Sequence, residues 1–190
     1  LSPNGIMERS EAPVLAYEGL KPSVGILAGS VPQSLTMLEN GLRFEVDLAS
    51  GQKTGWFLDQ ARNRAAAARR AGGLRVLDAF CNQGGFGLAC AAAGAASVLA
   101  VDSSAPALAA VTANAARNGL SDQVSTREAN AFDLLRELER SGERFGLVVL
   151  DPPAFAKNKA SVEGALRGYK DINLRAMKLL EPGGYLVTCS

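Results

Sequence analysis

The amino-acid sequence predicts an α/β fold in which a parallel sheet carries helices on both faces, preceded by a small β-rich N-terminal segment. After residue 74, apolar strands alternate with helical segments in five steps, and each strand is a continuous Val/Leu-rich run. The composition is that of a compact globular chain, with 190 residues of which 47% are hydrophobic and 21% charged. We therefore expect ligands to bind at the carboxyl ends of the strands.

The β-rich pattern occupies the first 50 residues. Short apolar runs alternate there with Gly and Pro, and the runs at residues 35–38 and 42–48 flank an Asn40-Gly41 turn, which predicts a hairpin. A helix rich in Ala and Arg follows and ends near Gly72 and Gly73.

The second part of the chain contains the strands and helices of the sheet. The predicted strands cover residues 75–80, 97–102, 124–130, 147–151 and 185–190. One predicted helix ends at residue 93, and the other three cover residues 105–118, 132–140 and 168–180.

The composition excludes several kinds of site. Without any His, the chain has no His-ligated metal, no Ser-His-Asp triad and no imidazole base. A net charge of +1 lacks the basic character of a dedicated nucleic-acid-binding module. Cys81, Cys90 and Cys189 form no CxxC pair, and no leader or membrane span is evident, so we expect a cytoplasmic protein without a metal. A homo-oligomer is left open, and we expect both ends to have been cut from a longer protein.

A glycine-rich turn and two acids predict a cofactor site. The turn at residues 78–87 lacks the third small residue of a dinucleotide motif because Cys90 stands there, which leaves an NAD(P) oxidoreductase as a remote alternative. Asp78 at the end of the first strand suits a cationic amino group, and Asp102 at the end of the second suits ribose hydroxyls. Together they favour S-adenosyl-L-methionine, although either acid could instead cap the following helix.

A third acid follows the fourth strand. Two prolines after Asp151 rigidify the exit loop and hold this carboxylate at the mouth of the site, unless the segment is a plain turn. Basic residues after this loop and on the Ala/Arg helix form either a phosphate-contacting rim or solvated surface charge. They are Lys157, Lys159, Arg167, Lys170, Arg62, Arg64, Arg69 and Arg70.

These segments resemble the Rossmann-like class I S-adenosylmethionine-dependent methyltransferases, and within them the bacterial 23S rRNA cytosine-5 methyltransferases with an amino-terminal PUA domain. The resemblance is carried by GQKTGWFLDQ (51–60), DAFCNQGGFG (78–87), AVDSS (100–104), DPPAF (151–155) and GYKDINLRAMKLLEPGG (168–184). It implies that residues 51–190 are a methyltransferase domain truncated after its fifth strand. Residues 1–50 would then link it to a PUA domain that precedes residue 1.

The resemblance also implies S-adenosyl-L-methionine as the cofactor, 23S rRNA as the partner, and a role for each matching residue. The expected cofactor-binding residues are Asp78, Phe80, Gln83, Gly84 and Gly85 for the methionine part, Asp102 for the ribose, Asn130 and Ala131 for the adenine edge, and Thr54, Phe57 and Asp59 to close the site. The expected substrate-binding residues are Pro152, Phe155, Lys157 and Lys170. Many relatives carry Asp where Asn130 stands and Arg where Ala61 stands.

The implied chemistry needs a thiol and a carboxylate. A thiolate adds to carbon 6 of a cytosine that has left its stack, because carbon 5 is otherwise a poor nucleophile, and Asp151 stabilises or protonates the adduct. Thr188, Cys189 and Ser190 match the family's Thr-x-Ser, so the nucleophilic cysteine is expected directly after Ser190. We expect the 190-residue chain to hold cofactor without turnover. The alternatives are methylation of a guanine ring or an exocyclic amine in rRNA, and a catalytically idle RNA-binding domain.

Overall fold

The computed structural model describes residues 2–10, 13–48, 55–156 and 159–189. The chain forms two compact units, Leu1–Leu35 with Val46–Trp56, and Thr36–Glu45 with Phe57–Ser190. The chain therefore passes between the units more than once, and the domain boundary at residue 50 stays a prediction.

The first unit contains an antiparallel pair of strands, β1 (Gly5–Ser10) and β2 (Ser23–Gly29), with the short helix η1 (Pro13–Glu18) between them in sequence. Nη1 of Arg9 donates a hydrogen bond of 3.2 Å to the carbonyl oxygen of Leu48 within this unit. A β-rich N-terminal segment was predicted, and the structure confirms it.

The predicted hairpin is also confirmed. It consists of β3 (Ser34–Glu39) and β4 (Leu42–Asp47), joined by Asn40 and Gly41 with φ angles of 51° and 83°. Two successive positive φ values match the right-handed twist of the strands, and Asn and Gly adopt them at low cost.

Two asparagines of α3 (Ala105–Arg117) and its C-cap bind the backbone of β4. Oδ1 of Asn114 accepts from the Glu45 N–H at 3.0 Å, and Oδ1 of Asn118 accepts from the Arg43 N–H at 2.9 Å. Nδ2 of Asn118 donates to the Arg43 carbonyl at 2.7 Å. These side chains complete the hydrogen bonding of a strand edge, which anchors this part of the hairpin to α3.

The second unit is built on a five-stranded sheet with the order β7-β6-β5-β8-β9, in which every neighbouring pair is parallel. Its strands are β5 (Arg75–Ala79), β6 (Ser97–Asp102), β7 (Val124–Glu128), β8 (Phe145–Leu150) and β9 (Leu180–Thr188). Every residue of β8 is buried, as the continuous apolar run predicts for a central parallel strand.

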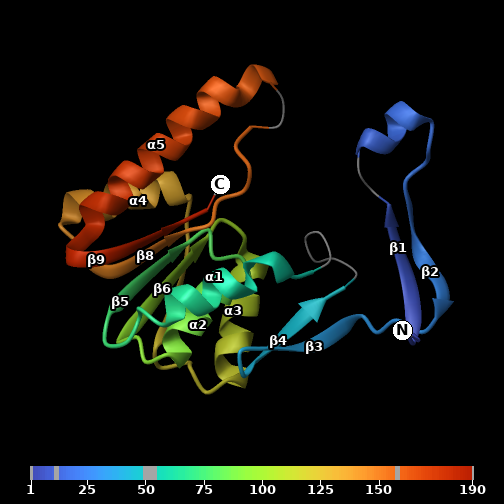
Figure 1. Ribbon diagram of the computed structural model, residues 1–190, viewed down its shortest axis with the longest axis horizontal. Helices are drawn as coiled ribbons and strands as arrows, with labels where there is room; N and C mark the ends of the chain where they lie inside the picture. The colour runs from blue at the N-terminus through green and yellow to red at the C-terminus, as the bar shows by residue number, and fades with distance from the viewer. Residues whose placement is uncertain (1, 11–12, 49–54, 157–158, 190) are drawn as a thin grey trace. The chain divides into compact units, whose positions relative to one another are not determined.

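Helices cover both faces of this sheet (Figure 1). The short helix η2 (Leu58–Gln60), α1 (Ala61–Ala68), α2 (Gly85–Ala92) and α3 lie on one side, and α4 (Ala131–Ser141) and α5 (Val162–Leu179) lie on the other. The α/β fold with a parallel sheet is therefore confirmed. Leu134, Leu138 and Ile172 belong to the core beneath α4 and α5, and Val111 of α3 belongs to the core on the opposite face.

Helix α5 begins earlier than predicted, at Val162 rather than residue 168. Gly164 and Gly168 make its first half a poor helix by propensity, yet Gly168 allows a close approach to an aromatic ring. A Cβ built on Gly168 would lie 3.2 Å from Cδ2 of Phe155. Tertiary packing therefore extends this helix beyond what its local sequence favours.

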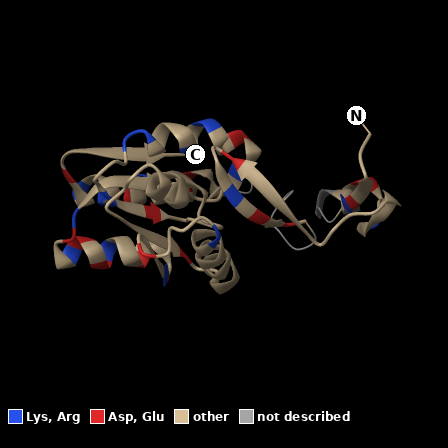
Figure 2. Ribbon diagram, turned by 90° about the horizontal axis from the view of Figure 1, so that it is seen from below, with Lys and Arg blue, Asp and Glu red and all other residues tan. Residues whose placement is uncertain are grey.

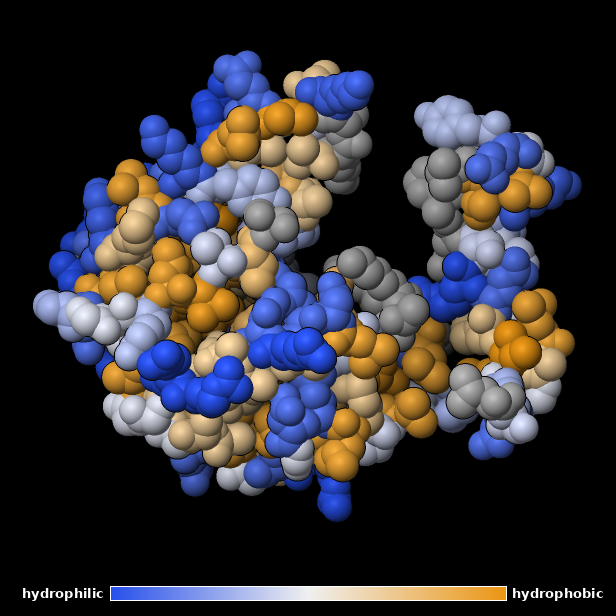
Figure 3. Space-filling view, viewed as in Figure 1, coloured by the Kyte–Doolittle hydropathy of each residue, from blue (hydrophilic) through white to orange (hydrophobic). Residues whose placement is uncertain are grey.

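The surface of the second unit mixes apolar and charged residues. Basic and acidic residues are interspersed along the helices (Figure 2), and apolar side chains reach solvent over α5 and β9 (Figure 3). The exposed large apolar residues there are Val162, Leu166, Leu174, Met177 and Tyr185. Within the described ranges, no helix is both long and apolar enough to cross a membrane.

Candidate active site

The parallel sheet brings the ends of its five strands to one edge. Ala79 of β5 pairs with Val101 of β6 and Leu150 of β8, and Leu150 in turn pairs with Thr188 of β9. The residues that follow the strands therefore lie along the carboxyl edge of the sheet. They include Phe80, Asn130, Asp151 and Cys189, and Asp102 lies at the same edge as the last residue of β6.

The turn between β5 and α2 is strained. Phe80, Asn82 and Gly84 have φ angles of 64°, 47° and 82°. Asn and Gly tolerate this region, but a bulky residue such as Phe is a genuine outlier there, and such strain is concentrated at functional sites. A Cβ on Gly84 would lie 3.1 Å from the Val111 methyls, so a glycine is also needed for packing.

Asp78 lies beneath this turn, with a side chain that is almost fully buried. Its Oδ2 accepts the Gly87 N–H at 2.7 Å, whereas its Oδ1 has no hydrogen-bond partner among the described residues. Burial raises the pKa of Asp78 to about 7, against the Gly87 hydrogen bond, and the charges of Asp151 and Asp102 raise it further. A cation beside Oδ1 would relieve the cost of ionising this carboxyl group.

The Asp102 carboxylate binds the backbone of two turns at the carboxyl edge of the sheet. Its Oδ2 accepts the Asn82 N–H at 2.9 Å and its Oδ1 accepts the Ser104 N–H at 3.0 Å. Each carboxylate oxygen keeps a second lone pair, so both can accept a further hydrogen bond. Both predicted acids therefore bind the backbone at the start of a helix, and both have acceptor capacity left for a ligand.

Four aromatic rings form a cluster beside this turn. The ring of Phe80 lies 6.4 Å from Phe132 and 6.3 Å from Phe155, and Phe155 lies 5.4 Å from Phe132 and 4.4 Å from Tyr169. Phe132 and Phe155 border a hollow of about 460 Å³ against the first half of α5. Aromatic walls of this kind suit the flat face of a nucleobase.

Asp151 is approached by a side chain of η2. Nε2 of Gln60 lies 3.5 Å from Oδ1 of Asp151, and Oε1 of Gln60 accepts from Nδ2 of Asn63 at 2.6 Å. The Cys189 thiol lies 3.9 Å from the same Oε1. Burial, followed by the charge of Asp151, raises the pKa of Cys189 to about 11, so this thiol is protonated and a weak nucleophile at neutral pH.

The other predicted residues are more scattered. Oδ1 of Asn130 caps α4 by accepting the Phe132 N–H at 2.9 Å, and the Phe57 carbonyl accepts from Nη2 of Arg64 at 2.9 Å. Asp59 and Lys170 are exposed on η2 and α5, Ala131 is buried, and Gln83, Gly85 and Pro152 are half-buried. Thr54 and Lys157 lie outside the described residues.

One basic residue of the predicted rim is not available to phosphates. Arg64 is 4% exposed, and its Nε and Nη2 donate to the Glu39 carboxylate at 2.6 and 2.7 Å. The helical period turns Arg64 away from Arg62 and towards the protein interior. The sequence analysis also did not propose Gln60 or Phe132 as site residues. The only signal for Gln60 is its place at the end of the FLDQ motif, and the only signal for Phe132 is its aromatic side chain shortly after β7.

Comparison with known proteins identifies the family. The sequence profile of the S-adenosylmethionine-dependent methyltransferases matches residues 18–190. The chain belongs to this family. The cofactor of this methyltransferase is S-adenosylmethionine, and the fold is the Rossmann-like fold that its motifs predicted.

Curated relatives of the methyltransferase include two proteins named Ribosomal RNA large subunit methyltransferase I. The protein from Shewanella denitrificans is 50% identical over 187 residues, and the protein from Photobacterium profundum is 46% identical over 187 residues. Each match covers 97% of this chain and 47% of the relative. The chain thus spans about half the length of these relatives.

Solved structures of methyltransferases resemble this chain too. A protein from Streptococcus mutans assigned as a SAM-dependent methyltransferase is 26% identical with a TM-score of 0.75, over 87% of this chain and 43% of that one. SMU.776, a structure complexed with SAH, is 28% identical with a TM-score of 0.77, over 87% of this chain and 44% of that one.

Proposed function

We propose that this chain is the cofactor-binding catalytic part of an rRNA methyltransferase that forms 5-methylcytosine in 23S rRNA in the cytoplasm. The proposal of an RNA substrate rests on the identity of 46–50%, over 187 residues, to relatives named Ribosomal RNA large subunit methyltransferase I. The aromatic cluster at the carboxyl edge supports a planar base as the acceptor.

The residues at the edge fit the cofactor. The unpartnered Oδ1 of Asp78 suits its cationic amino group, and the Asp102 carboxylate suits its ribose hydroxyls. S-adenosylmethionine supplies an electrophilic methyl group. Phe80, Asn130 and the backbone of the glycine turn would orient the remainder of the molecule at the start of α2 and α4.

Asp151 is the proposed catalytic carboxylate. At the carboxyl edge of the sheet, the Asp151 carboxylate would accept hydrogen bonds from the exocyclic amine of a cytosine. When the carboxyl group is protonated, it would donate to N3 of the cytosine. Gln60 would hold the carboxylate in place through its Nε2, while Asn63 fixes the orientation of the amide. The attacking thiol is proposed to come from the residue after Ser190, because Thr188, Cys189 and Ser190 match the family's Thr-x-Ser. The raised pKa of Cys189 makes its own thiol a poorer candidate.

The test uses the full-length protein, unmodified 23S rRNA and cofactor with a labelled methyl group. The label should appear in 5-methylcytidine after digestion to nucleosides. Label in a methylguanosine or on an exocyclic amine would support the alternative reaction, and binding of RNA without any transfer would support an idle domain.

A parallel reaction with residues 1–190 separates binding from chemistry. We expect this chain to bind the cofactor in calorimetry and to transfer no methyl group. Transfer to carbon 5 by this chain alone would show that Cys189, or a route without a thiol, performs the reaction.

A further inference from the structure

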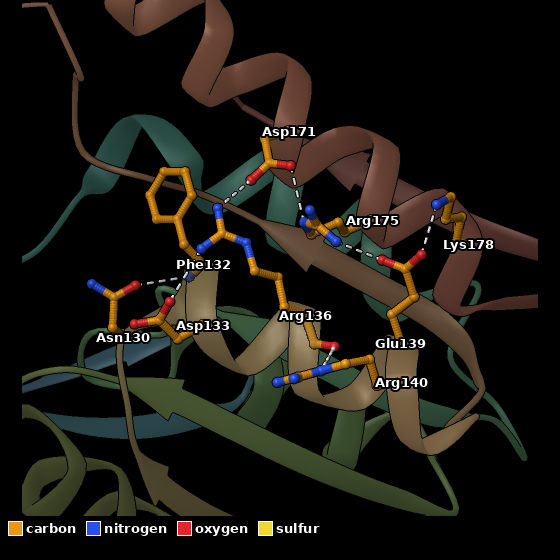
Figure 4. Close-up of polar contacts among 9 residues, drawn as sticks. All are labelled: Asn130, Phe132, Asp133, Arg136, Glu139, Arg140, Asp171, Arg175 and Lys178. Carbon is orange, nitrogen blue, oxygen red and sulfur yellow. Dashed lines mark hydrogen bonds and ion pairs between the residues drawn. The ribbon is translucent and has the colours of Figure 1, made fainter.

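Several basic residues of α4 and α5 are paired with carboxylates, among them Arg136, Arg175 and Lys178 (Figure 4). Arg136 contacts Asp133 at 3.2 Å and Asp171 at 3.0 Å, and Arg175 contacts Asp171 at 2.9 Å. Glu139 accepts from Arg175 at 2.7 Å and from Lys178 at 2.6 Å. These carboxylates neutralise much of the positive charge of the three basic side chains.

Helix α1 differs, because the segment from Ala61 to Arg70 has no acidic residue. Arg62, Arg69 and Arg70 are exposed, and within the described ranges no carboxylate pairs with them. Arg62 and the C-cap residue Arg69, whose backbone is still helical, are seven residues apart and so lie on the same side of the helix axis, and Arg70 follows in the turn after α1. We call Arg62, Arg69 and Arg70 the basic stripe of α1 and the turn that follows it.

This stripe runs beside a hollow of about 430 Å³ between α1 and β9. Asn63 of α1 and Arg70 of the following turn border it on one side. Tyr185 and Thr188 of β9, with the next residue Cys189, border it on the other. The Arg70 guanidinium lies 5.4 Å from the centroid of the Tyr185 ring. At its other end, the Cys189 thiol contacts Gln60, the residue that also approaches Asp151.

We propose that α1 and this hollow bind the RNA strand next to the target nucleotide. Arg62, Arg69 and Arg70 contact its phosphates, and a neighbouring base stacks on Tyr185 with the Arg70 guanidinium. The strand is thereby aligned so that the target base reaches Asp151. This inference rests on the proposed RNA substrate and adds the surface that binds it.

The test compares two triple variants of the full-length protein. Arg62→Gln, Arg69→Gln and Arg70→Gln remove the stripe, and Arg127→Gln, Arg140→Gln and Arg144→Gln remove the same charge from exposed positions elsewhere. Binding of a labelled 23S rRNA fragment is titrated over a range of salt concentrations. We expect the stripe variant to bind at least about tenfold more weakly near 0.1 M salt, and its salt slope to fall by about 2, since each phosphate contact contributes about 0.7.

The control variant should keep the wild-type affinity and slope, and both variants should keep the wild-type affinity for the cofactor. Equal losses in the two variants, or no loss in the stripe variant, would overturn the proposed surface while wild-type methylation of rRNA leaves the proposed function intact. A wild-type protein that neither binds nor methylates rRNA would overturn both.

Tyr185 gives a second, independent readout. Tyr185→Ala should weaken RNA binding about tenfold with an unchanged salt slope, because stacking releases no counterions, and Tyr185→Phe should restore the affinity. Loss of affinity in the Phe variant as well would contradict a stacking role.

Discussion

Gln60 Nε2 lies 3.5 Å from Oδ1 of Asp151, although the two residues are 91 positions apart in the sequence. Because Asn63 donates to Oε1 of Gln60, the amide must present its NH₂ group to the carboxylate. Gln60 is thus placed to hold the Asp151 carboxylate in position.

Gln60→Glu should lower kcat of the full-length enzyme by about tenfold to a hundredfold, with little change in KM for the cofactor. A second carboxylate beside Asp151 raises the pKa of the pair, so the pH profile should shift to higher pH. Gln60→Asn, which keeps the amide but shortens it, should shift the profile less. An unchanged profile in Gln60→Glu would remove Gln60 from this role.

The raised pKa of Asp78 predicts a pH dependence of stability. The pKa of Asp78 in the folded protein is about 7 and its ordinary value is 3.8, so the folded state binds the proton more tightly. The contribution of Asp78 to the free energy of unfolding is fully present below about pH 4. It is lost as the pH rises through about 7, which lowers the free energy of unfolding by up to about 4 kcal/mol. Urea unfolding of the wild type and Asp78→Asn from pH 4 to 8 measures it, since the Asn variant lacks this component. Parallel curves for the two proteins would contradict the assignment.

Asp102→Ala should weaken cofactor binding by about 1–3 kcal/mol, because ribose hydroxyls would lose a charged acceptor. Isothermal calorimetry checks this, with Asp122→Ala at an exposed position as the control. Asp102→Asn keeps one acceptor oxygen for the neighbouring N–H groups and should lose less affinity for the cofactor. An affinity that is unchanged in Asp102→Ala would exclude Asp102 from the site.

The buried pair of Arg64 and Glu39 predicts a large single-variant cost. Arg64→Met leaves the carboxylate of Glu39 without its buried partner and should lower the free energy of unfolding by about 3–5 kcal/mol. Combining it with Glu39→Leu should recover much of the loss, whereas Arg62→Met on the exposed face should cost less than about 0.5 kcal/mol. Urea unfolding distinguishes these outcomes, and equal losses in Arg64→Met and Arg62→Met would contradict the pairing.

The Cys189 thiol should react slowly with iodoacetamide at pH 8, because its pKa is raised to about 11 and little thiolate is present. Cys189→Ala in the full-length protein should keep most of the methyl transfer. Loss of transfer with unchanged cofactor affinity would assign the nucleophile to Cys189 instead.

Much of the fold follows from local patterns in the sequence. The Asn40-Gly41 dipeptide specifies the hairpin turn, and the Val/Leu run of β8 specifies a buried parallel strand. The start of α5 could not be predicted, because Gly164 and Gly168 disfavour a helix locally, while the packing of Gly168 against Phe155 is a tertiary contact.

The site was predictable where a motif carries it and not where distant residues meet. The acids Asp78 and Asp102 follow from their places at strand ends. Other features depend on tertiary contacts that no local pattern encodes. These are the unpartnered Oδ1 of Asp78, the contact of Gln60 with Asp151 and the ion pair of Arg64 with Glu39.

The anchoring of the hairpin limits how the gene can be divided. Residues 36–45 are inserted ahead of the methyltransferase fold in sequence, yet they supply Glu39 to Arg64 and backbone groups to Asn114 and Asn118. A truncation that starts at residue 51 would discard those ten residues and remove partners of three polar side chains, Arg64 of α1, Asn114 of α3 and its C-cap residue Asn118. The shortest autonomous version of this methyltransferase should therefore start upstream of Thr36, and chimaeras that exchange N-terminal modules should carry the hairpin with the catalytic half.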